Sequence, residues 1–136
     1  MPSTAELLCV PPDIVAKVWP HVRVMIKLAV EATDLSSIEE LENDVLSGRQ
    51  LLWLAWLDGK IVASATTHLI KPREDKVCVL TACAGHHRET WMPLRARIEQ
   101  YARDEGAKKM QLFGRKGWER VLDGYHVEHV VLEKVL

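Results

Sequence analysis

Residues 81–106 read TACAGHHRETWMPLRARIEQYARDEG, and the layout of this stretch decides the fold class. Small and apolar residues end at Gly85, polar residues follow, and residues 90–105 then carry apolar positions at helical spacing. Residues 76–84 before the helix and 108–114 after it have the composition of strands. A strand, a helix and a strand in succession imply a parallel pair joined by a right-handed crossover.

The rest of the chain alternates between helical and strand periodicity. We expect Pro20 to kink or break its helix, because the proline ring clashes with the carbonyl group four residues earlier. Ser36 and Glu39 predict a capping box, and Asp58-Gly59 predicts a tight hairpin turn. In chain order the predicted elements are a strand at 6–10, helices at 11–32 and 36–48, strands at 50–57, 60–70 and 76–84, a helix at 90–105, a strand at 108–114, a helix at 116–123 and a strand at 125–136. The order β-α-α-β-β-β-α-β-α-β predicts a mixed α+β fold, with a central, mostly antiparallel mixed sheet flanked by helices.

Composition limits the classes of function. A length of 136 residues suits one domain, residues 1–136, with one core. The net charge of −1 does not favour a nucleic-acid partner. No apolar stretch is long enough to span a bilayer and the first residues do not resemble a secretion signal, so we expect no membrane association and a cytoplasmic location.

The cysteines predict a reducing compartment and no metal site. Cys9, Cys78 and Cys83 are odd in number and lack paired spacing. In a regular strand, the odd separation of Cys78 and Cys83 would point their thiols to opposite faces of the sheet. We therefore expect three structural thiols and no metal ligand set.

The element order and the second half of the chain resemble the GNAT superfamily of acyl-CoA-dependent N-acyltransferases. IEQYARDEGAKKMQLFG (98–114) is similar to the central helix of that family and the strand after it. GWERVLDGYHVEHVVLEKVL (117–136) is similar to the last helix, the Gly-aromatic corner at Gly124-Tyr125 and the final strand. The first half agrees in element order alone. The resemblance implies a GNAT-like fold.

In that family the junction between the strand and the central helix binds the pyrophosphate of coenzyme A. Backbone N–H groups and the positive end of the helix hold the anion. The family pattern is Gln or Arg, two residues, Gly, one residue, then Gly or Ala. Counting back along an ungapped helix places it on this chain, and the resemblance then implies the cofactor-binding residues Gly85, His86, His87, Arg88, Glu89, Thr90 and Trp91.

The chain departs from this pattern at three positions. Glu89 stands where the first glycine is usual, and its charge repels phosphate. Trp91 takes the second small position, where an indole would fill space needed by the cofactor. A tryptophan at a helix start also has a structural explanation, as a cover for the sheet edge. His86-His87 is read as part of a polar loop, because adjacent side chains seldom face one site. In many relatives a tyrosine protonates the leaving thiolate from the position of Arg120, which is a poor proton donor.

No catalytic residue is identified from the sequence. The central strands near the expected amine site offer Thr66, Thr67, His68 and Thr81, and no acidic residue. A general-base role for His68 is left unassigned. Basic residues also surround Trp118, and they form either a ligand patch with Arg88 or a solvated helix face; they are Arg115, Lys116 and Arg120.

Trp53 and Trp56 are three positions apart in one predicted strand and hence on opposite faces. We expect one in the core, and the other under a helix or in a subunit contact.

Two functions remain open. The preferred one is a non-catalytic GNAT scaffold that needs no cofactor and serves binding or assembly, with a protein partner or a second copy of the chain. Small GNAT-like proteins with altered cofactor loops occur in tailed phages and prophages, so this hypothesis includes a phage-encoded, virion-associated protein. The alternative is an N-acyltransferase that uses acetyl-CoA to acylate an amine of a small molecule or protein.

Overall fold

A single five-stranded sheet forms the centre of the molecule. The computed structural model describes residues 5–32, 36–86, 88–113 and 116–136. The strands are β1 (Glu6–Cys9), β2 (Leu51–Leu57), β3 (Lys60–Ile70), β4 (Lys76–Gly85) and β5 (Ala107–Leu112), and they lie in that order. The first four strands pair antiparallel with one another, whereas β5 is parallel to β4. The mixed, mostly antiparallel sheet confirms the predicted fold class.

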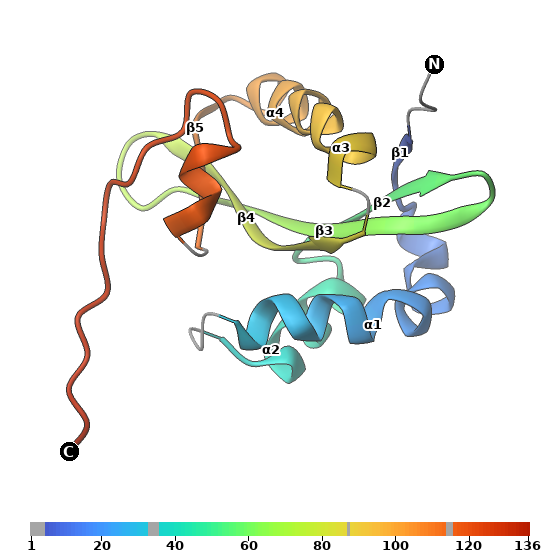
Figure 1. The fold of residues 1–136 in the computed structure, drawn as a ribbon, viewed down its shortest axis with the longest axis horizontal. Helices are drawn as coiled ribbons and strands as arrows, with labels where there is room; N and C mark the ends of the chain where they lie inside the picture. Colours follow the sequence, from blue (N-terminus) through green and yellow to red (C-terminus); the bar gives the residue numbers. More distant parts are fainter. Residues whose placement is uncertain (1–4, 33–35, 87, 114–115) are drawn as a thin grey trace.

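Helices cover both faces of this sheet. The helices are α1 (Val15–Glu31), α2 (Ile38–Ser47), α3 (Arg88–Trp91) and α4 (Arg95–Asp104), with short 3-10 turns η1 (Pro12–Ile14), η2 (Met92–Leu94) and η3 (Lys116–Arg120). Figure 1 shows α1 and α2 on one face and α3 and α4 on the other. Because both faces are covered, the central strands are apolar on both sides, as the run LLWLAWL in β2 illustrates.

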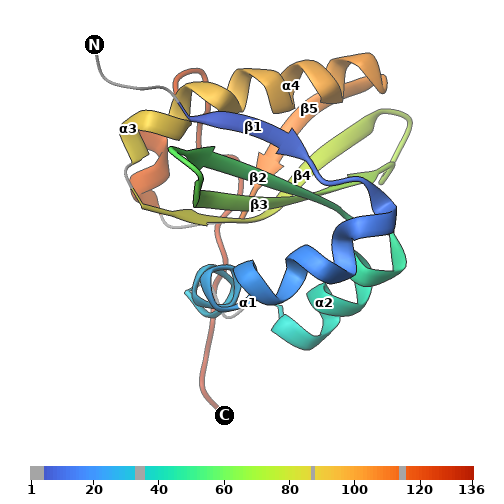
Figure 2. The ribbon, with the colours of Figure 1, turned by 90° about the vertical axis from the view of Figure 1, so that its right-hand side faces the viewer.

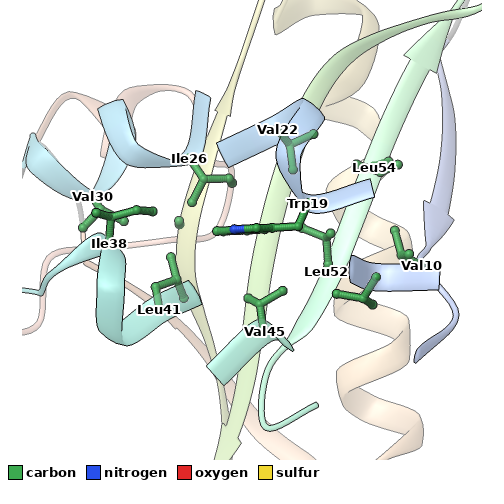
Figure 3. Packing of buried hydrophobic residues seen from close by; sticks show 12 residues of the cluster. Val10, Trp19, Val22, Ile26, Val30, Ile38, Leu41, Val45, Leu52 and Leu54 are labelled. Atoms are coloured by element: carbon green, nitrogen blue, oxygen red, sulfur yellow. The ribbon is translucent and has the colours of Figure 1, made fainter. Parts of the chain in front are cut away.

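The larger core lies between the sheet and the pair α1 and α2. It is built from Val10, Val15, Trp19, Val22, Ile26, Val30, Ile38, Leu41, Val45, Leu52, Leu54 and Ala82. Figure 3 shows the Trp19 indole in the middle of this cluster. Its Nε1 donates to Glu42 Oε2 of α2 at 2.5 Å, and Arg23 Nε donates to the same oxygen at 2.8 Å. These bonds fix the two helices against each other.

A second core lies under α4. Trp53 is buried there with Ala65 and Ile98, and its ring meets that of Tyr101 edge-on at a centroid distance of 5.3 Å. Trp56 is more than a third exposed, and its Nε1 donates to Glu6 Oε2 at 3.0 Å. The prediction that one of the two tryptophans belongs to the core is confirmed.

Local sequence signals predicted the first two helices and the β2–β3 hairpin with small errors in position. Helix α1 runs unbroken through Pro20, so the expected break does not occur. Figure 2 shows α1 changing direction after its first turns, which agrees with a kink. The cap of helix α2 lies one residue later than predicted, because Ser37 rather than Ser36 accepts the Glu40 N–H, at 3.1 Å. The predicted hairpin turn is confirmed, with positive φ at both residues of the turn.

The helix predicted at 90–105 is divided. Helix α3 begins at Arg88, and a 3-10 turn separates it from α4. Pro93 lies in that turn, where it supplies no N–H and restricts Met92 before it. The count along an ungapped helix, which placed the family pattern on residues 86–91, therefore rests on a helix that the chain does not form.

The last predicted elements change most. The helix predicted at 116–123 is the short 3-10 turn η3. The strand predicted at 125–136 is wrong, because these residues form no regular secondary structure and extend away from the body. A strand is stabilised by hydrogen bonds with a neighbouring strand. Among the described residues, no strand of the sheet pairs with residues 125–136.

Candidate functional site

The sheet opens between β4 and β5. Their pairing ends at Leu80 and Leu112, while β4 continues to Gly85. In the described part of the chain, no strand lies on the β5 side of β4 from Thr81 onward. Backbone N–H and C=O groups on that side are therefore left for a ligand or water.

A cavity of about 980 Å³ opens at this gap. Small side chains of β3 and β4 create much of the space, namely Ala63, Ser64, Ala65, Ala82 and Ala84. Helices on both faces supply the walls, and Phe113 and Trp118 also line the cavity. The volume lies at the upper end of the range for small-molecule sites, which is roughly 300–1,000 Å³.

Strand β4 carries a β-bulge inside the cavity. The partners of Thr66 and Thr67 are Ala82 and Leu80, which leaves Thr81 as the extra residue. A bulge bends the strand and shifts the alternation of its side chains by one position. After Thr81, the side chains to the end of β4 therefore point to the opposite face from the one that regular alternation would give.

The bulge overturns the prediction for the cysteine thiols. Because one residue is inserted between them, Cys78 and Cys83 lie on the same face of the sheet, the face covered by α4. With Cys9 they are free thiols. Among the described residues, no group of three or more His, Cys, Asp or Glu side chains could hold a metal ion.

The threonines considered as active-site residues serve the sheet instead. Thr81 Oγ1 lies 2.6 Å from Thr66 Oγ1 and 2.5 Å from Gln50 Oε1. Thr67 Oγ1 accepts the Nε1–H of Trp53 at 2.9 Å. These hydroxyls satisfy buried polar partners, so they hold the strands together rather than act as bases.

The junction after β4 is tied closely to β3. A Cβ atom on Gly85 would stand 2.5 Å from Val62 O and 2.6 Å from the Cβ of Ala63, so a larger residue does not fit without a shift. The His86 N–H donates to Val62 O at 2.7 Å. The His86 carbonyl oxygen accepts the Nε1–H of Trp91 at 2.7 Å. The N–H of His86 is therefore bonded to β3, and two hydrogen bonds hold the loop backbone at His86 in place.

Trp91 covers the end of the sheet, as the structural explanation predicted. Its side chain is buried in a cluster with Ala5, Ala55, Val62 and Ala63. The same side chain lines the cavity. The indole is therefore part of a wall and does not stand free in the loop.

Charged groups gather at the α3 and α4 side of the cavity. Arg88, Glu89 and Arg95 line it, and His86 lies beside them. The Nε atom of Arg95 is buried without a hydrogen-bond partner, 3.7 Å from Glu99 Oε2. Glu89 in the lining and Glu99 beside it balance the two guanidinium charges, so the feature that favours an anionic ligand at this end is the Arg95 Nε–H without a hydrogen-bond partner. His87 lies outside the described residues. The carbonyl oxygen of Thr90 accepts the N–H of Ala5 at 3.2 Å, away from the gap between β4 and β5.

Other predicted positions do not converge on this site. His68 and Arg120 are absent from the described cavity lining, whereas Trp118 is part of it. Arg115 and the side chain of Lys116, two members of the predicted basic patch, lie outside what the structure describes. Among the described residues, none of the helices has the length and apolar character of a bilayer-spanning segment.

Several lining residues were missed by the sequence analysis. Arg95 lies on α4, and His21, Val24 and Leu28 lie on α1. Val24 and Leu28 are 69% and 65% exposed, although they belong to a helix whose other apolar residues are buried. The available signal was an apolar pair, four residues apart, outside the buried stripe of the helix.

Comparisons with known proteins identify the fold. No protein-family model matches the sequence, and no curated protein matches it. An aminoglycoside acetyltransferase, meta-AAC0020, from an uncultured soil metagenomic sample in complex with sisomicin superposes with a TM-score of 0.71 at 14% identity, covering 97% of this chain and 95% of that one. The aminoglycoside N-acetyltransferase AAC(6')-Iy in complex with CoA gives 0.68 at 13% identity, covering 99% and 97%. A predicted acetyltransferase with acetyl-CoA from Clostridium acetobutylicum gives 0.67 at 12% identity, covering 97% and 96%. The chain has the fold of GNAT acetyltransferases.

Proposed function

We propose that the cavity beside β4 binds a coenzyme A thioester and that the chain acts as an N-acyltransferase. The supporting observation is the position of the cavity. It opens where β4 loses its β5 neighbour, and it borders the junction from Gly85 to Trp91. Solved acetyltransferases of the same fold include complexes with CoA and acetyl-CoA. A bound thioester would supply an activated acyl group for an amine.

The free edge of β4 fits a ligand that carries amide groups. An extended chain can add to a strand edge through main-chain hydrogen bonds. From Thr81 to Gly85 this edge faces the cavity, beside small side chains that leave room. The arrangement suits the two amides of a pantetheine arm.

The phosphate end would depend on side chains more than on loop amides. The His86 N–H is already bonded to Val62 O, and α3 has a single turn. Arg95 offers an Nε–H that has no hydrogen-bond partner, with Glu99 Oε2 3.7 Å away as an ion-pair partner, and Arg88 is exposed and lines the same cavity. Charge-assisted bonds to phosphate are about twice as strong as neutral ones. Glu89 opposes them, so the site is weaker than its geometry would otherwise allow.

The acceptor side favours an amine with an apolar body. Near α1 the cavity is lined by Val24, Met25 and Leu28, with His21 as the polar group. Within the described lining, Glu89 is the one carboxylate. A polycationic acceptor needs several carboxylates, so we infer a monoamine or a peptide amine instead.

A second candidate function is a non-catalytic scaffold for binding or assembly, in the cytoplasm or in a phage particle. Arg120 is exposed at the position where the family resemblance implies a proton-donating tyrosine. Tyr125 does not replace it, because its hydroxyl donates to Glu99 Oε2 at 2.7 Å. Burial and the Glu99 carboxylate raise the pKa of Tyr125 further. Neither Arg120 nor Tyr125 supplies a matched acid, which favours a protein that binds without turnover.

Titration with acetyl-CoA and CoA tests the proposal. Ligand at 100 times its Kd should stabilise the fold by about 2.7 kcal/mol in thermal unfolding. Replacing Arg95 by Gln should weaken binding roughly 10-fold or more, since a hydrogen bond to a charged group contributes about 1.5–3 kcal/mol. Arg103→Gln is the matched control, because Arg103 lies on the same helix, exposed and away from the cavity. Glu89→Gln should strengthen binding.

The outcomes separate the two functions. Binding together with release of free thiol in the presence of a panel of primary amines supports the enzyme. Binding without thiol release from any amine supports the scaffold. If neither the natural chain nor Glu89→Gln is stabilised by acetyl-CoA, the cofactor proposal is wrong.

A further inference from the structure

The core layer under α4 is thinly filled. Helix α4 reads RARIEQYARD, and its buried residues are Ile98 and Ala102. On the sheet face below this helix, Trp53 and Ala65 are buried. The apolar side chains packed around them are half-buried, namely Leu7, Cys9, Leu51, Leu80, Cys83, Tyr101 and Met110. A mostly charged helix thus covers a wide apolar area of the sheet with few apolar side chains of its own.

The cavity beside β4 extends into this layer. We call the part of the cavity under α4 the α4 channel, and its lining residues are Leu7, Trp53, Ala65, Leu80, Cys83 and Ile98. Burial raises the pKa of the Cys83 thiol to about 12, although the side chain keeps some accessible surface. A raised pKa of this origin means that water does not solvate the thiolate well. The accessible surface of Cys83 therefore faces enclosed space.

One row of paired residues across the sheet gives the direction of the channel. Cys83 pairs with Ala65, Ala65 pairs with Trp53, and Trp53 pairs with Cys9. Residues that are directly opposite in neighbouring strands point to the same face. A second cavity of about 320 Å³ lies at the far end of this row, and Leu7 and Trp53 line both cavities. The α4 channel therefore runs from β4 across Ala65 to the Trp53 indole.

The Trp53 indole ends the channel. Its Nε1 donates to Thr67 Oγ1 at 2.9 Å, and its ring meets that of Tyr101 edge-on at a centroid distance of 5.3 Å. These contacts hold the ring in one position. Neighbouring strands lie about 4.8 Å apart, so the channel from β4 to β2 is roughly 10 Å long. At roughly 1.2 Å per bond, as in an extended backbone, an alkyl chain of about eight carbons covers that distance.

The walls of the channel suit an alkyl chain. The charged lining residues of the cavity lie near α3 and the start of α4, and they are Arg88, Glu89 and Arg95. Inside the channel, the indole N–H of Trp53 is already bonded to Thr67. A polar ligand group would lose its hydration there without gaining a hydrogen-bond partner, whereas an alkyl chain gains from leaving water.

We propose that the α4 channel takes the acyl chain of a medium-chain thioester, with about six to eight carbons. This inference rests on the proposed function, in which the thioester binds along the free edge of β4. Leu80 is the last residue of β4 that pairs with β5, and it also lines the channel. The free edge and the channel therefore meet at Leu80, where the sulfur end of the pantetheine arm would lie. An acetyl group would leave most of the channel without contacts.

Binding of a series of thioesters tests the proposal. CoA and its acetyl, butanoyl, hexanoyl, octanoyl and dodecanoyl thioesters are titrated into the full chain by calorimetry, below their micelle concentrations. Each buried methylene group contributes about 0.8 kcal/mol, so the affinity should rise about fourfold per carbon. The rise should stop at about eight carbons, because the Trp53 indole ends the channel.

Two substitutions change the channel itself. Ala65→Leu places a larger side chain in its middle, so the ratio of octanoyl to acetyl affinity should fall about 10-fold or more. Ile98→Ala widens the channel and should move the preference toward the dodecanoyl thioester. This second variant needs no extra room in the core, so it serves where Ala65→Leu fails to fold.

Ala102→Leu is the matched control. Ala102 is buried on the same helix but lies outside the described lining of both cavities. Its substitution should leave the ratio of octanoyl to acetyl affinity unchanged. Circular dichroism on each variant confirms that it is folded.

The outcomes separate this inference from the proposed function. Equal affinities for all the thioesters would overturn the channel and leave the cofactor site in place. A preference for long chains that Ala65→Leu and Ile98→Ala both leave unchanged would mean that the acyl chain binds another surface, and it would overturn the channel too. If neither CoA nor any thioester binds, the cofactor site is wrong, and this inference falls with it.

Discussion

The indole nitrogen of Trp91 donates a hydrogen bond to the carbonyl oxygen of His86 at 2.7 Å, and this bond closes the loop between β4 and α3. Trp91→Phe removes the donor and leaves that carbonyl without its partner, which should cost about 1–3 kcal/mol of unfolding free energy. Trp91→Ala should cost about 3–5 kcal/mol, because a buried aromatic side chain is lost. Urea unfolding measures both.

Trp56→Phe is the matched control for this loop. Trp56 also donates through Nε1, but to the exposed carboxylate of Glu6 at 3.0 Å. Water can replace an exposed partner, so the change should stay within about 0.5 kcal/mol. Equal losses at Trp91 and Trp56 would contradict a structural role for the bond to His86.

Gly85 should be intolerant of any side chain. A Cβ atom there would stand 2.5 Å from Val62 O, and backbone atoms cannot move aside easily. Gly85→Ala should therefore destabilise the fold by about 1–3 kcal/mol. Gly117→Ala is the control, because nothing lies within 4 Å of a Cβ at Gly117. The difference in thermal midpoint between the two variants tests the prediction, which fails if they unfold together.

Local sequence signals predicted the elements whose cause is itself local. The Asp58-Gly59 turn, the glycine at the end of α2 and the strand-helix-strand unit appear as expected. Features that depend on a neighbour were not predictable. The bulge at Thr81 exists only in relation to β3, and it reversed the inference about the thiols of Cys78 and Cys83.

The sequence predicted only those parts of the candidate site that are close together along the chain. The junction residues are contiguous, so any correct placement of β4 brings Gly85 and Trp91 to one place. Arg95 and Leu28 come from helix faces whose orientation is set by packing; an apolar pair outside the buried stripe of α1 marks Leu28, whereas no local pattern marks Arg95. Residues 125–136 are the clearest case, because their composition favours a strand whereas a strand requires a neighbour.

Acid should unfold the protein partly through Glu42. Hydrogen bonds from Trp19 and Arg23 lower the pKa of this carboxyl below its usual 4.5, and bonds from Gln50 and Arg49 lower the pKa of Asp44 below its usual 3.8. A lowered folded-state pKa contributes stability that is present above the ordinary pKa. That stability is lost as the pH falls through the folded value. Unfolding free energy should therefore be level near neutrality and fall below about pH 4.5.

Glu42→Gln tests this assignment. The variant should be less stable at pH 7, and its unfolding free energy should change less between pH 7 and pH 2, because one of the linked protons is gone. Urea titrations across this pH range give the two slopes. Parallel curves for the variant and the natural chain would show that Glu42 does not carry the acid sensitivity.

The thiols that face α4 should react slowly while the chain is folded. Burial raises the pKa of Cys83 to about 12 and that of Cys78 to about 11, from the usual 9.0. The thiolate is the reactive form, and at pH 8 a pKa of about 12 leaves about one Cys83 side chain in ten thousand ionised, against about one in ten when unfolded. Iodoacetamide followed by mass spectrometry should therefore label Cys83 on the order of a thousand times more slowly in the folded chain than in urea. The same raised pKa values mean that stability present below pH 9 is lost as the pH rises further, since the unfolded chain ionises first. Cys83 is partly exposed and lines the cavity, so labelling of the folded chain at the rate seen in urea would show that its surroundings do not raise the pKa of the thiol.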